Sequence, residues 1–372
     1  MLIGVPREIK PQEYRVGLTP EAVAELVHRG HSVLVETGAG EAIGAGNDAY
    51  RDAGASIVAD PQAAFAADMI VKVKEPQVSE RQQMRPGQVL FTYLHLAPDL
   101  EQTRDLLATG AVCIAYETVT DARGGLPLLR PMSQVAGRMA VQAGASALER
   151  EHGGRGVLLG GVPGVAPARV LILGGGEVGF NAAQMAIGLQ ADVTILDRDP
   201  VVLERLSNHF GASARVIYAN RATLDENIVS ASLVIGAVLI PGAAAPKLVT
   251  RDHLARMVPG AVVVDVSIDQ GGCCESSRAT THSAPTFIEQ GIVHYCVANM
   301  PGAVPHTSTY ALNNATLPHI LALADKGWRR ALRDDPHLRH GLNVCAGRVT
   351  QPAVAEAHGY DLTPAETLLE DD

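Results

Sequence analysis

A glycine-rich turn directly after an apolar run constrains this chain more than any other feature. Residues 169–173 read RVLIL and the next six read GGGEVG, so glycines 174, 176 and 179 have the spacing GxGxxG. An alanine-rich stretch that is typical of a helix follows. In such a strand–turn–helix unit, Gly174 allows the tight turn, Gly176 lets a pyrophosphate approach the helix N-terminus, and Gly179 lets helix and strand pack closely. The pattern predicts a dinucleotide-binding domain of the Rossmann type.

An acidic residue closes the next predicted strand. Asp197 lies 23 residues after Gly174, close to the ~20-residue offset of the ribose-binding acid in this class of domain. A carboxylate at this position accepts hydrogen bonds from the ribose hydroxyls and repels a 2′-phosphate. The sequence therefore favours NAD over NADP as the cofactor, although the adjacent Arg198 offsets part of that repulsion.

Short apolar runs alternate with helical patterns along nearly the whole chain, as in βαβ units. Expected strands are 1–5, 31–36, 69–73, 89–93 and 112–115, then 168–173, 192–196, 215–218, 232–237, 261–266 and 294–298. We predict an α/β protein with two doubly wound parallel-sheet (Rossmann-like) domains joined by long helices near 131–150 and 307–324. The tail after Trp328 is expected to be partly helical and to end in a loose acidic segment.

The domain boundaries follow from the length of the last part of the chain. Residues after 300 are too few to fold well alone. We therefore expect residues 1–130 and 301–372 to form one discontinuous domain for substrate and catalysis. Residues 131–300 are expected to form the NAD-binding domain.

The charge and the apolar segments argue against two classes of partner. The formal net charge is −10 and no run of Lys and Arg exists, which speaks against nucleic acid and against an anionic membrane surface. Residues 228–246 contain no charged residue, but glycines and Pro241 interrupt them. We interpret them as a buried strand and a loop, not as a membrane span.

The cysteines and the N-terminus point to the cytoplasm. The five cysteines are an odd number without a CxxC pair, which is typical of reduced thiols in a cytosol. The first residues have a very short apolar run and an acid at Glu8, unlike a signal peptide. Cys273 and Cys274, taken with His282 and His294, match no zinc-ligand spacing, so we predict no metal site.

Four polar residues stand at the ends of predicted strands, where parallel sheets place their ligands. Arg15 lies in the loop after the first strand, Lys74 near the end of the strand 69–73, and His95 after the run 90–94. Lys72 alternates with Lys74, so both are expected on one face of that strand. Asp269 follows the strand 261–266 in the nucleotide-binding part, and a cleft between the two domains is expected to bring these groups together.

These residue types suit a small carboxylate substrate. Arg15 is able to grip a carboxylate with two hydrogen bonds, and Lys74 adds a second positive charge. His95 titrates near neutrality and is suited to proton transfer, while Asp269 would orient water, ammonia or the imidazole. Each residue alone also has a structural interpretation: a surface cation, a partner of Glu75, a satisfied histidine at a core edge and a turn residue, respectively. Their combination favours the functional one.

Motifs along almost the whole chain resemble those of the alanine dehydrogenase family. They are GVPRE (4–8), YRV (14–16), LTP (18–20), KVKEP (72–76), FTYLHL (91–96), AYET (115–118), PMS (131–133), GGVPGV (160–165), DQGG (269–272), VANMP (297–301) and TST (307–309). The resemblance implies NAD-dependent, reversible oxidative deamination of L-alanine to pyruvate and ammonia by hydride transfer. It also implies a homo-oligomer, commonly a homohexamer, with small molecules as its substrates.

The resemblance assigns roles residue by residue. His95 and Asp269 correspond to the catalytic pair, and Arg15 and Lys74 to the substrate-binding cations. The implied NAD contacts are Ser133, Gly174, Gly176, Glu177, Val178, Gly179, Asp197, Asn220, Val238, Leu239, Val266, Ser267, Ile268, Asp269, Arg278, Val297, Ala298, Asn299 and Met300.

Three alternatives stay open at this level. The first is the NAD-binding component of a proton-translocating transhydrogenase, which has a similar N-terminal region but no organic substrate. The second is a catalytically silent dinucleotide sensor, which would need the glycine turn but not Arg15, Lys74, His95 and Asp269 together. The third is a dehydrogenase for a related small amino acid or for glyoxylate, because one methylene changes binding by only ~1–3 kcal/mol.

Overall fold

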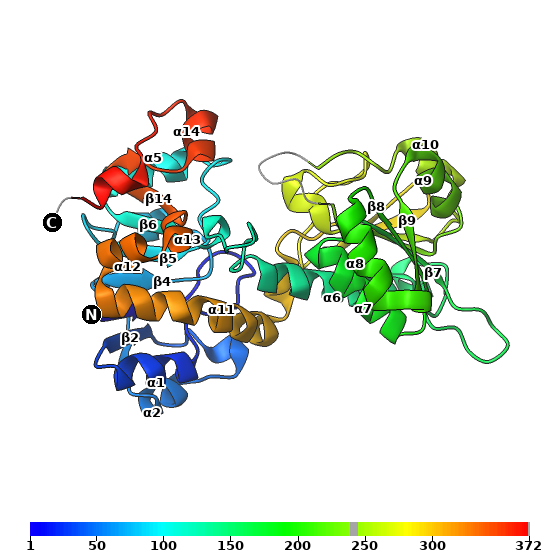
Figure 1. Ribbon diagram of the computed structural model, residues 1–372. Coiled ribbons are helices and arrows are strands. Elements are labelled where there is room, and N and C mark those ends of the chain that lie inside the picture. Colours follow the sequence, from blue (N-terminus) through cyan, green and yellow to red (C-terminus); the bar gives the residue numbers. More distant parts are fainter. Residues whose placement is uncertain (239–244, 371–372) are drawn as a thin grey trace. The chain divides into compact units, whose positions relative to one another are not determined.

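The chain folds into two compact units, each built on its own mostly parallel sheet. The computed structural model describes residues 1–238 and 245–370 (Figure 1). Unit 1 consists of Met1–Met132 and Val304–Asp372, and unit 2 of Ser133–Ala303. Helices cover both faces of each sheet, which confirms the predicted α/β fold class with two Rossmann-like sheets.

Unit 1 contains an eight-stranded sheet with the strand order β15-β14-β6-β5-β4-β1-β2-β3. Its strands are β1 (Leu2–Val5), β2 (Ser32–Glu36), β3 (Ser56–Val58), β4 (Met69–Val71), β5 (Val89–Thr92), β6 (Val112–Ala115), β14 (Leu342–Cys345) and β15 (Arg348–Val349). The strands β1 to β6 pair in parallel, whereas β14 runs antiparallel to both β6 and β15.

Alternate residues of the unit 1 strands enter two separate cores, one on each face of the sheet. Met69 and Val71 lie in one core and Ile70 in the other, as the two-residue period of a strand requires. Both cores consist mainly of aliphatic side chains, so the central strands read as continuous apolar runs instead of alternating ones. This is why short runs such as 69–71 identify buried parallel strands in the sequence.

The first helix of unit 1 begins at a recognisable capping residue. Thr19 caps the first helix by accepting a hydrogen bond from the Ala22 N–H, and Pro20 occupies its first position. The helices are α1 (Pro20–His28), α2 (Asn47–Asp52), α3 (Pro61–Phe65), α4 (Val78–Arg81), α5 (Leu100–Thr109), α11 (Pro305–Lys326), α12 (Trp328–Asp334), α13 (Pro336–Arg339) and α14 (Pro352–His358).

Unit 2 contains a seven-stranded sheet with the strand order β12-β13-β11-β10-β7-β8-β9. The strands are β7 (Arg169–Leu173), β8 (Asp192–Asp197), β9 (Ala214–Tyr218), β10 (Leu233–Gly236), β11 (Val262–Asp265), β12 (Thr286–Glu289) and β13 (Ile292–Tyr295). Six of them are parallel, and β12 is antiparallel to β13. The strand order reverses at β7, which carries the glycine turn at its C-terminal end.

Glycines allow the helix that begins at Arg130 to pack closely on the Rossmann core. The helices of this part are α6 (Arg130–Ala147), α7 (Glu177–Gly188), α8 (Pro200–Phe210), α9 (Arg221–Ile228) and α10 (Arg251–Arg256). A Cβ atom at Gly137 would lie 2.2 Å from the Val178 carbonyl oxygen, and one at Gly144 would lie 2.6 Å from the Leu233 side chain. Any larger residue at these two positions would push α6 away from its neighbours.

The structure corrects several sequence-based expectations. The strand expected at 294–298 is β13, which already begins at Ile292. The tail after Trp328 does contain helices, but it also supplies β14 and β15 to the edge of the unit 1 sheet. No helix within residues 1–238 and 245–370 is both long and apolar enough to cross a membrane.

Candidate functional site

Arg15 is a buried cation, not a surface one. Its side chain is 2% exposed, and the Glu13 carboxylate accepts hydrogen bonds from Nε at 2.6 Å and from Nη2 at 2.5 Å. Nη1 lies 3.0 Å from the Met132 sulfur. Burial alone would lower the pKa of Arg15, but the hydrogen bonds and the charge of Glu13 more than offset this, so the pKa is raised. The guanidinium is therefore permanently charged and fixed in orientation.

The segment that carries Arg15 is held in place by its neighbours in unit 1. Thr309 and Asn313 of α11 accept hydrogen bonds from the backbone N–H groups of Val16 and Thr19. A Cβ at Gly17 would come 2.4 Å from the Val71 carbonyl oxygen, so this loop passes directly over the end of β4. Arg15 is thereby placed near the residues that follow β4.

Lys74 lies in the segment that follows β4, and its surroundings make its ammonium group easier to deprotonate. Burial and the positive charge of Arg15 lower the pKa of Lys74 below its ordinary value of 10.5. Within the described residues, the Glu75 carboxylate accepts a hydrogen bond from Lys10 Nζ and none from Lys74, and its negative charge only partly offsets the lowering of the Lys74 pKa. Two neighbouring cations in a buried place attract an anion strongly, because an anion relieves their mutual repulsion.

Lys72 has a structural role that could not be inferred from the sequence. The expectation that Lys72 and Lys74 share a strand is wrong, because β4 ends at Val71. Lys72 is fully buried, and its Nζ lies 3.0 Å from Glu8 Oε2 and 2.7 Å from Glu80 Oε1. The other oxygen of Glu8 accepts the N–H groups of Val73 and Lys74 at 2.7 and 3.3 Å. This buried cluster fixes the backbone from which Lys74 projects.

His95 stands on a strained turn after β5. Its φ angle is 52°, in the left-handed region that non-glycine residues rarely adopt. Glu117 supports this conformation, since its Oε1 accepts the His95 N–H at 2.6 Å and both of its oxygens accept the Leu94 N–H at 3.2 Å. The imidazole Nδ1 lies 3.8 Å from Glu117 Oε1, and the side chain is 46% exposed. His95 is thus accessible, and not a satisfied histidine at the edge of the core.

Tyr93 connects His95 to the buried cations. Its ring lies parallel to the His95 imidazole with the centroids 5.8 Å apart. Its hydroxyl donates to the Leu128 carbonyl at 2.6 Å, and burial raises the pKa of the phenol although the charge of Arg15 opposes this. Tyr93 is therefore a neutral phenol that stacks on the imidazole and feels the charge of the guanidinium.

In unit 2, the three motif glycines have the geometry that a dinucleotide cradle needs. Gly174 has a φ angle of 97°, and a Cβ there would lie 2.7 Å from the Ala237 carbonyl oxygen. A Cβ at Gly179 would lie 1.8 Å from the Gly174 carbonyl oxygen, so only glycine lets α7 start this close to β7. The space around Gly176 is open, and Gly176 is the N-cap of α7. An anion has room to approach the free N–H groups there.

A cavity of about 1070 Å³ opens beside this turn. Its walls include Gly174, Asp197, Asn220 and Val238 among the predicted cofactor contacts. Asp197 ends β8, and its carboxylate accepts the N–H groups of Gly175 at 2.6 Å and Asp199 at 2.8 Å. The volume and the acid fit the adenosine half of a dinucleotide.

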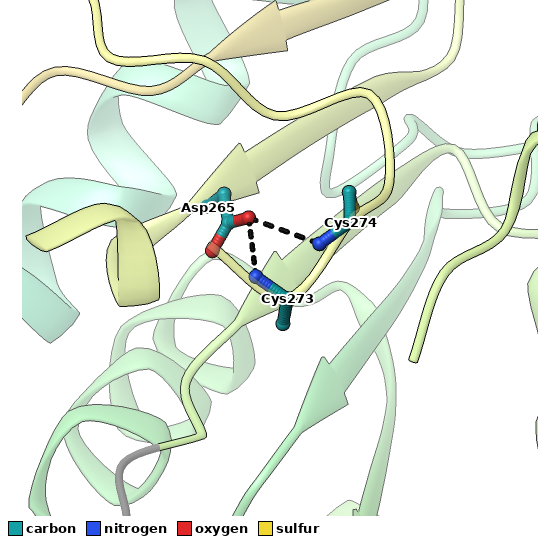
Figure 2. Close-up of side chains that lie close together, drawn as sticks. All are labelled: Asp265, Cys273 and Cys274. Atoms are coloured by element: carbon teal, nitrogen blue, oxygen red, sulfur yellow. Dashed lines mark hydrogen bonds between the residues drawn. The ribbon is translucent and has the colours of Figure 1, made fainter. Parts of the chain in front are cut away.

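Asp269 lies on a short turn that is bound from two sides. The turn is a 3-10 helix over Val266–Gln270, and Asp269 is exposed on it. Asp265, fully buried at the end of β11, accepts the N–H groups of Cys273 and Cys274 at 2.8 and 3.2 Å, as Figure 2 shows. Lys247 Nζ donates to the carbonyls of the same loop, those of Gly271, Gly272 and Cys274. The Asp265 carboxylate thus binds backbone N–H groups of this loop, and the Lys247 ammonium binds its backbone carbonyls.

Comparisons with known proteins agree along the whole chain. Residues 4–136 match the family model "Alanine dehydrogenase/PNT, N-terminal domain", and residues 140–352 match the corresponding C-terminal domain. The chain belongs to the alanine dehydrogenase/PNT family. The alanine dehydrogenase of Halomonas elongata is 56% identical over 99% of this chain and 100% of its own length. That of Bacillus subtilis is 53% identical, with 100% and 98% covered.

Two solved structures are similar to this chain in fold. A solved L-alanine dehydrogenase has a TM-score of 0.94 and 51% identity, covering 96% of this chain and 99% of its own. A transhydrogenase from Sinorhizobium meliloti has a TM-score of 0.83 and 25% identity, covering 94% and 100%. The curated alanine dehydrogenases are thus about twice as similar in sequence as this transhydrogenase.

The remaining cofactor residues expected for the family do not line the cavity beside Asp197. Arg278 is engaged elsewhere, since its guanidinium lies 3.9 Å from the centre of the Phe287 ring. Leu239 lies outside the described residues. The others occupy element ends: Ser133 in α6, Glu177 and Val178 at the start of α7, Val266, Ser267 and Ile268 on the Asp269 turn, and Val297, Ala298, Asn299 and Met300 after β13.

One group of possible metal ligands exists in the described residues, and it fits a structural role better. Asp265, Cys273 and Cys274 bring ligand-type atoms within 4.8 Å of one another. The Asp265 carboxylate is already engaged, because it also accepts the Ser277 hydroxyl at 2.5 Å. The neighbouring Cys274 thiol and burial raise the pKa of Cys273 well above its usual range, which disfavours the thiolate that a metal requires. His294 is engaged apart from this group, with Ser276.

The sequence did not single out four residues that shape the site. They are Glu8, Glu13, Glu117 and Lys247, each of which holds a predicted site residue or its backbone. Glu8 and Glu117 lie inside the family motifs GVPRE and AYET. An acidic residue within a mostly apolar motif was the sequence feature that could have pointed to them. For Lys247 the sequence carried no such signal.

Proposed function

We propose that this chain is a NAD-dependent L-alanine dehydrogenase, which interconverts L-alanine with pyruvate and ammonia. The observation that carries the proposal is the pair of neighbouring cations, the buried Arg15 and the half-buried Lys74, together with the accessible His95 in unit 1. Such a site suits a small molecule with a carboxylate. The identity to curated alanine dehydrogenases, 56% in one case, supports alanine as that molecule.

Arg15 and Lys74 bind the substrate carboxylate in this proposal. The Glu13 carboxylate holds the guanidinium through Nε and Nη2, so Nη1 is directed by the same fork toward Met132. The orientation is therefore set before the substrate arrives, which reduces the entropy lost on binding. Met132 then offers a polarisable wall of modest size next to the carboxylate, in keeping with a small substrate.

His95 and Asp269 act as the catalytic pair. Bound NAD would supply the acceptor for the hydride from the alanine Cα. The resulting iminium is attacked by water, and the carbinolamine collapses to pyruvate and ammonia. His95 takes up and returns the protons of these steps, and Asp269 orients the water or the imidazole. In this proposal, Asp269 and the residues that would hold the nicotinamide belong to unit 2, and the substrate-binding cations belong to unit 1.

Residues of unit 2 would hold the cofactor. Asp197 would accept hydrogen bonds from the adenosine ribose, and the N–H groups at the start of α7 would bind the pyrophosphate. The further contacts are those that the family resemblance assigns, namely Ser133, Glu177, Val178, Asn220, Val238, Leu239, Val266–Asp269, Arg278 and Val297–Met300. We also propose a cytoplasmic homohexamer, whose mass by light scattering should be six times the 39.0 kDa of one chain.

Initial rates with a panel of 2-oxo acids test the function. NADH oxidation with pyruvate should require ammonium and should exceed the rates with glyoxylate and 2-oxobutyrate. Oxidation that proceeds without ammonium would contradict an amino-acid dehydrogenase. A chain that only transfers hydride between two nucleotides would instead resemble the transhydrogenase in function.

The His95→Ala variant tests the assigned chemistry. It should lose nearly all turnover but keep its affinity for NADH, because His95 belongs to unit 1 and the glycine turn to unit 2. NADH fluorescence titration and steady-state rates provide the two measurements. Wild-type turnover in this variant would remove His95 from the mechanism.

A further inference from the structure

The cavity beside Asp197 contains more positive charge than a neutral ribose requires. The cationic side chains that line it are those of Arg198, Arg221, Lys247, His253 and Arg256. Three of them are occupied. Lys247 donates to backbone carbonyls, and Asp225 Oδ1 lies 2.7 Å from Arg256 Nη2 and 2.8 Å from His253 Nε2. These three hold the wall together and do not need a ligand.

The other two cations are available to a ligand. Arg198 follows Asp197 directly, is exposed, and forms no hydrogen bond or ion pair within residues 1–238 and 245–370. Arg221, at the start of α9, is 97% exposed, and its Nε lies 3.9 Å from Asp225 Oδ2. The Asp225 carboxylate already binds Arg256 and His253, so it offsets the positive charge of Arg221 only in part.

Asp197 repels a neighbouring anion less than a free carboxylate would. Each of its oxygens accepts one backbone N–H, from Gly175 and from Asp199. Hydrogen bonds of this kind spread the negative charge into the backbone amides. A second anionic group beside Asp197 therefore meets one partly compensated negative charge and the positive charges of Arg198 and Arg221. Of the other two acids that line the cavity, Asp225 is paired with Arg256 and His253, and Asp252 is the one that remains.

We propose that Arg198 and Arg221 form a subsite for the 2′-phosphate of NADP(H), so that NADPH serves this protein as a second coenzyme besides NADH. The phosphate carries a charge of about −1.5 to −2 at neutral pH and offers three acceptor oxygens for guanidinium groups. Asp197 stays in place, so NADH remains the better coenzyme. NADPH would give its hydride to the carbon of the iminium that pyruvate and ammonium form with loss of water, leaving NADP⁺ and a neutral amine, whose nitrogen takes one further proton from solvent to become the ammonium group of alanine.

Isothermal titration with adenosine 2′,5′-bisphosphate tests the subsite without any turnover, and 5′-AMP is the reference that lacks the 2′-phosphate. The wild-type protein should bind both ligands. The double variant Arg198→Ala, Arg221→Ala should bind the bisphosphate about tenfold more weakly, a loss of ~1.4 kcal/mol, and 5′-AMP nearly as before. Raising the salt concentration should weaken the bisphosphate more than 5′-AMP, because the two exposed guanidinium groups act only on the 2′-phosphate.

Arg169→Ala is the matched control. Arg169 is also an exposed arginine of unit 2, 60% exposed and near Asp192, but it stands at the opposite end of β7 from the glycine turn. It should leave both affinities unchanged. Equal affinities of the double variant and the wild type for the bisphosphate would overturn the subsite, as would a similar loss in the Arg169 control.

Steady-state rates then test coenzyme use, and this part rests on the proposed function. The wild type should reduce pyruvate and ammonium with NADPH, and the ratio of kcat/KM for NADPH to that for NADH should fall about tenfold in the double variant. Oxidation of NADH but not of NADPH would overturn the second coenzyme. If neither coenzyme is oxidised while the bisphosphate still binds through Arg198 and Arg221, the proposed function fails and the subsite stands.

Discussion

At the scale of single residues, the sequence indicated which charged groups matter but not what holds them. Arg15 and His95 were recognisable because they stand after apolar strands. Their partners are less visible, because Glu117 is 22 residues away from His95 in the chain and meets it only through the pairing of β5 with β6. The burial of Arg15 was likewise not predictable from its loop sequence. An arginine between polar neighbours can be buried in the site because the Glu13 carboxylate compensates its positive charge.

Glu117→Gln should show that the left-handed turn at His95 serves the reaction. The amide keeps one acceptor oxygen but replaces the other with a donor, so the support of a conformation that costs ~1–3 kcal/mol is weakened. We expect kcat with pyruvate to fall about tenfold while the pyruvate KM changes less than about threefold, since Arg15 and Lys74 are untouched. Glu117→Ala should lower kcat further. An unchanged kcat in both variants would contradict the positioning role.

The lowered pKa of Lys74 predicts a pH dependence of substrate binding. Lysine is charged below its pKa, so Lys74 loses its charge at a lower pH than an ordinary lysine with a pKa of 10.5. The kcat/KM for pyruvate at saturating ammonia should therefore fall as the pH rises through a value below 10.5. Lys74→Arg stays charged and should move this fall to higher pH. The same alkaline limb in the wild type and the variant would exclude Lys74 as its cause.

At the scale of elements, buried parallel strands were predictable and their ends were not. The run MIV of β4 is apolar throughout, but Lys72 and Lys74 continue its alternation after the strand has ended at Val71. The backbone leaves the sheet there because Glu8 takes over the hydrogen bonds of Val73 and Lys74. The strands β14 and β15 were missed for a different reason. They are four and two residues long and are defined by antiparallel pairing with β6 and with each other.

The loop that carries Asp269 offers a test at this scale. Lys247→Met removes the ammonium that binds the carbonyls of Gly271, Gly272 and Cys274 but keeps most of the length of the side chain. We expect faster hydrogen exchange within residues 266–274 and a fall in kcat of about tenfold, because Asp269 is held less firmly. Lys247→Arg should restore part of both. Unchanged exchange and unchanged kcat would mean that Asp265 alone suffices to hold the loop.

At the scale of the whole molecule, the alternation of apolar runs and helical patterns was enough to predict two Rossmann-like sheets. The order of the strands was not contained in that pattern, because it depends on which edges pair after the chain has crossed from one unit to the other. The assignment of substrate binding to unit 1 and of cofactor binding to unit 2 stays a prediction. It follows from the buried cations of the one and from the glycine turn of the other.

The transfer of the alanine Cα hydrogen to the cofactor is the central claim, and deuterium at that carbon tests it most directly. L-[2-²H]alanine should be incubated with the protein and NAD⁺ in ordinary water, and the NADH formed should be analysed by mass spectrometry and NMR. We predict one deuterium at C4 of the nicotinamide ring and slower turnover than with unlabelled alanine. NADH without deuterium, or no NADH at all, would contradict the account.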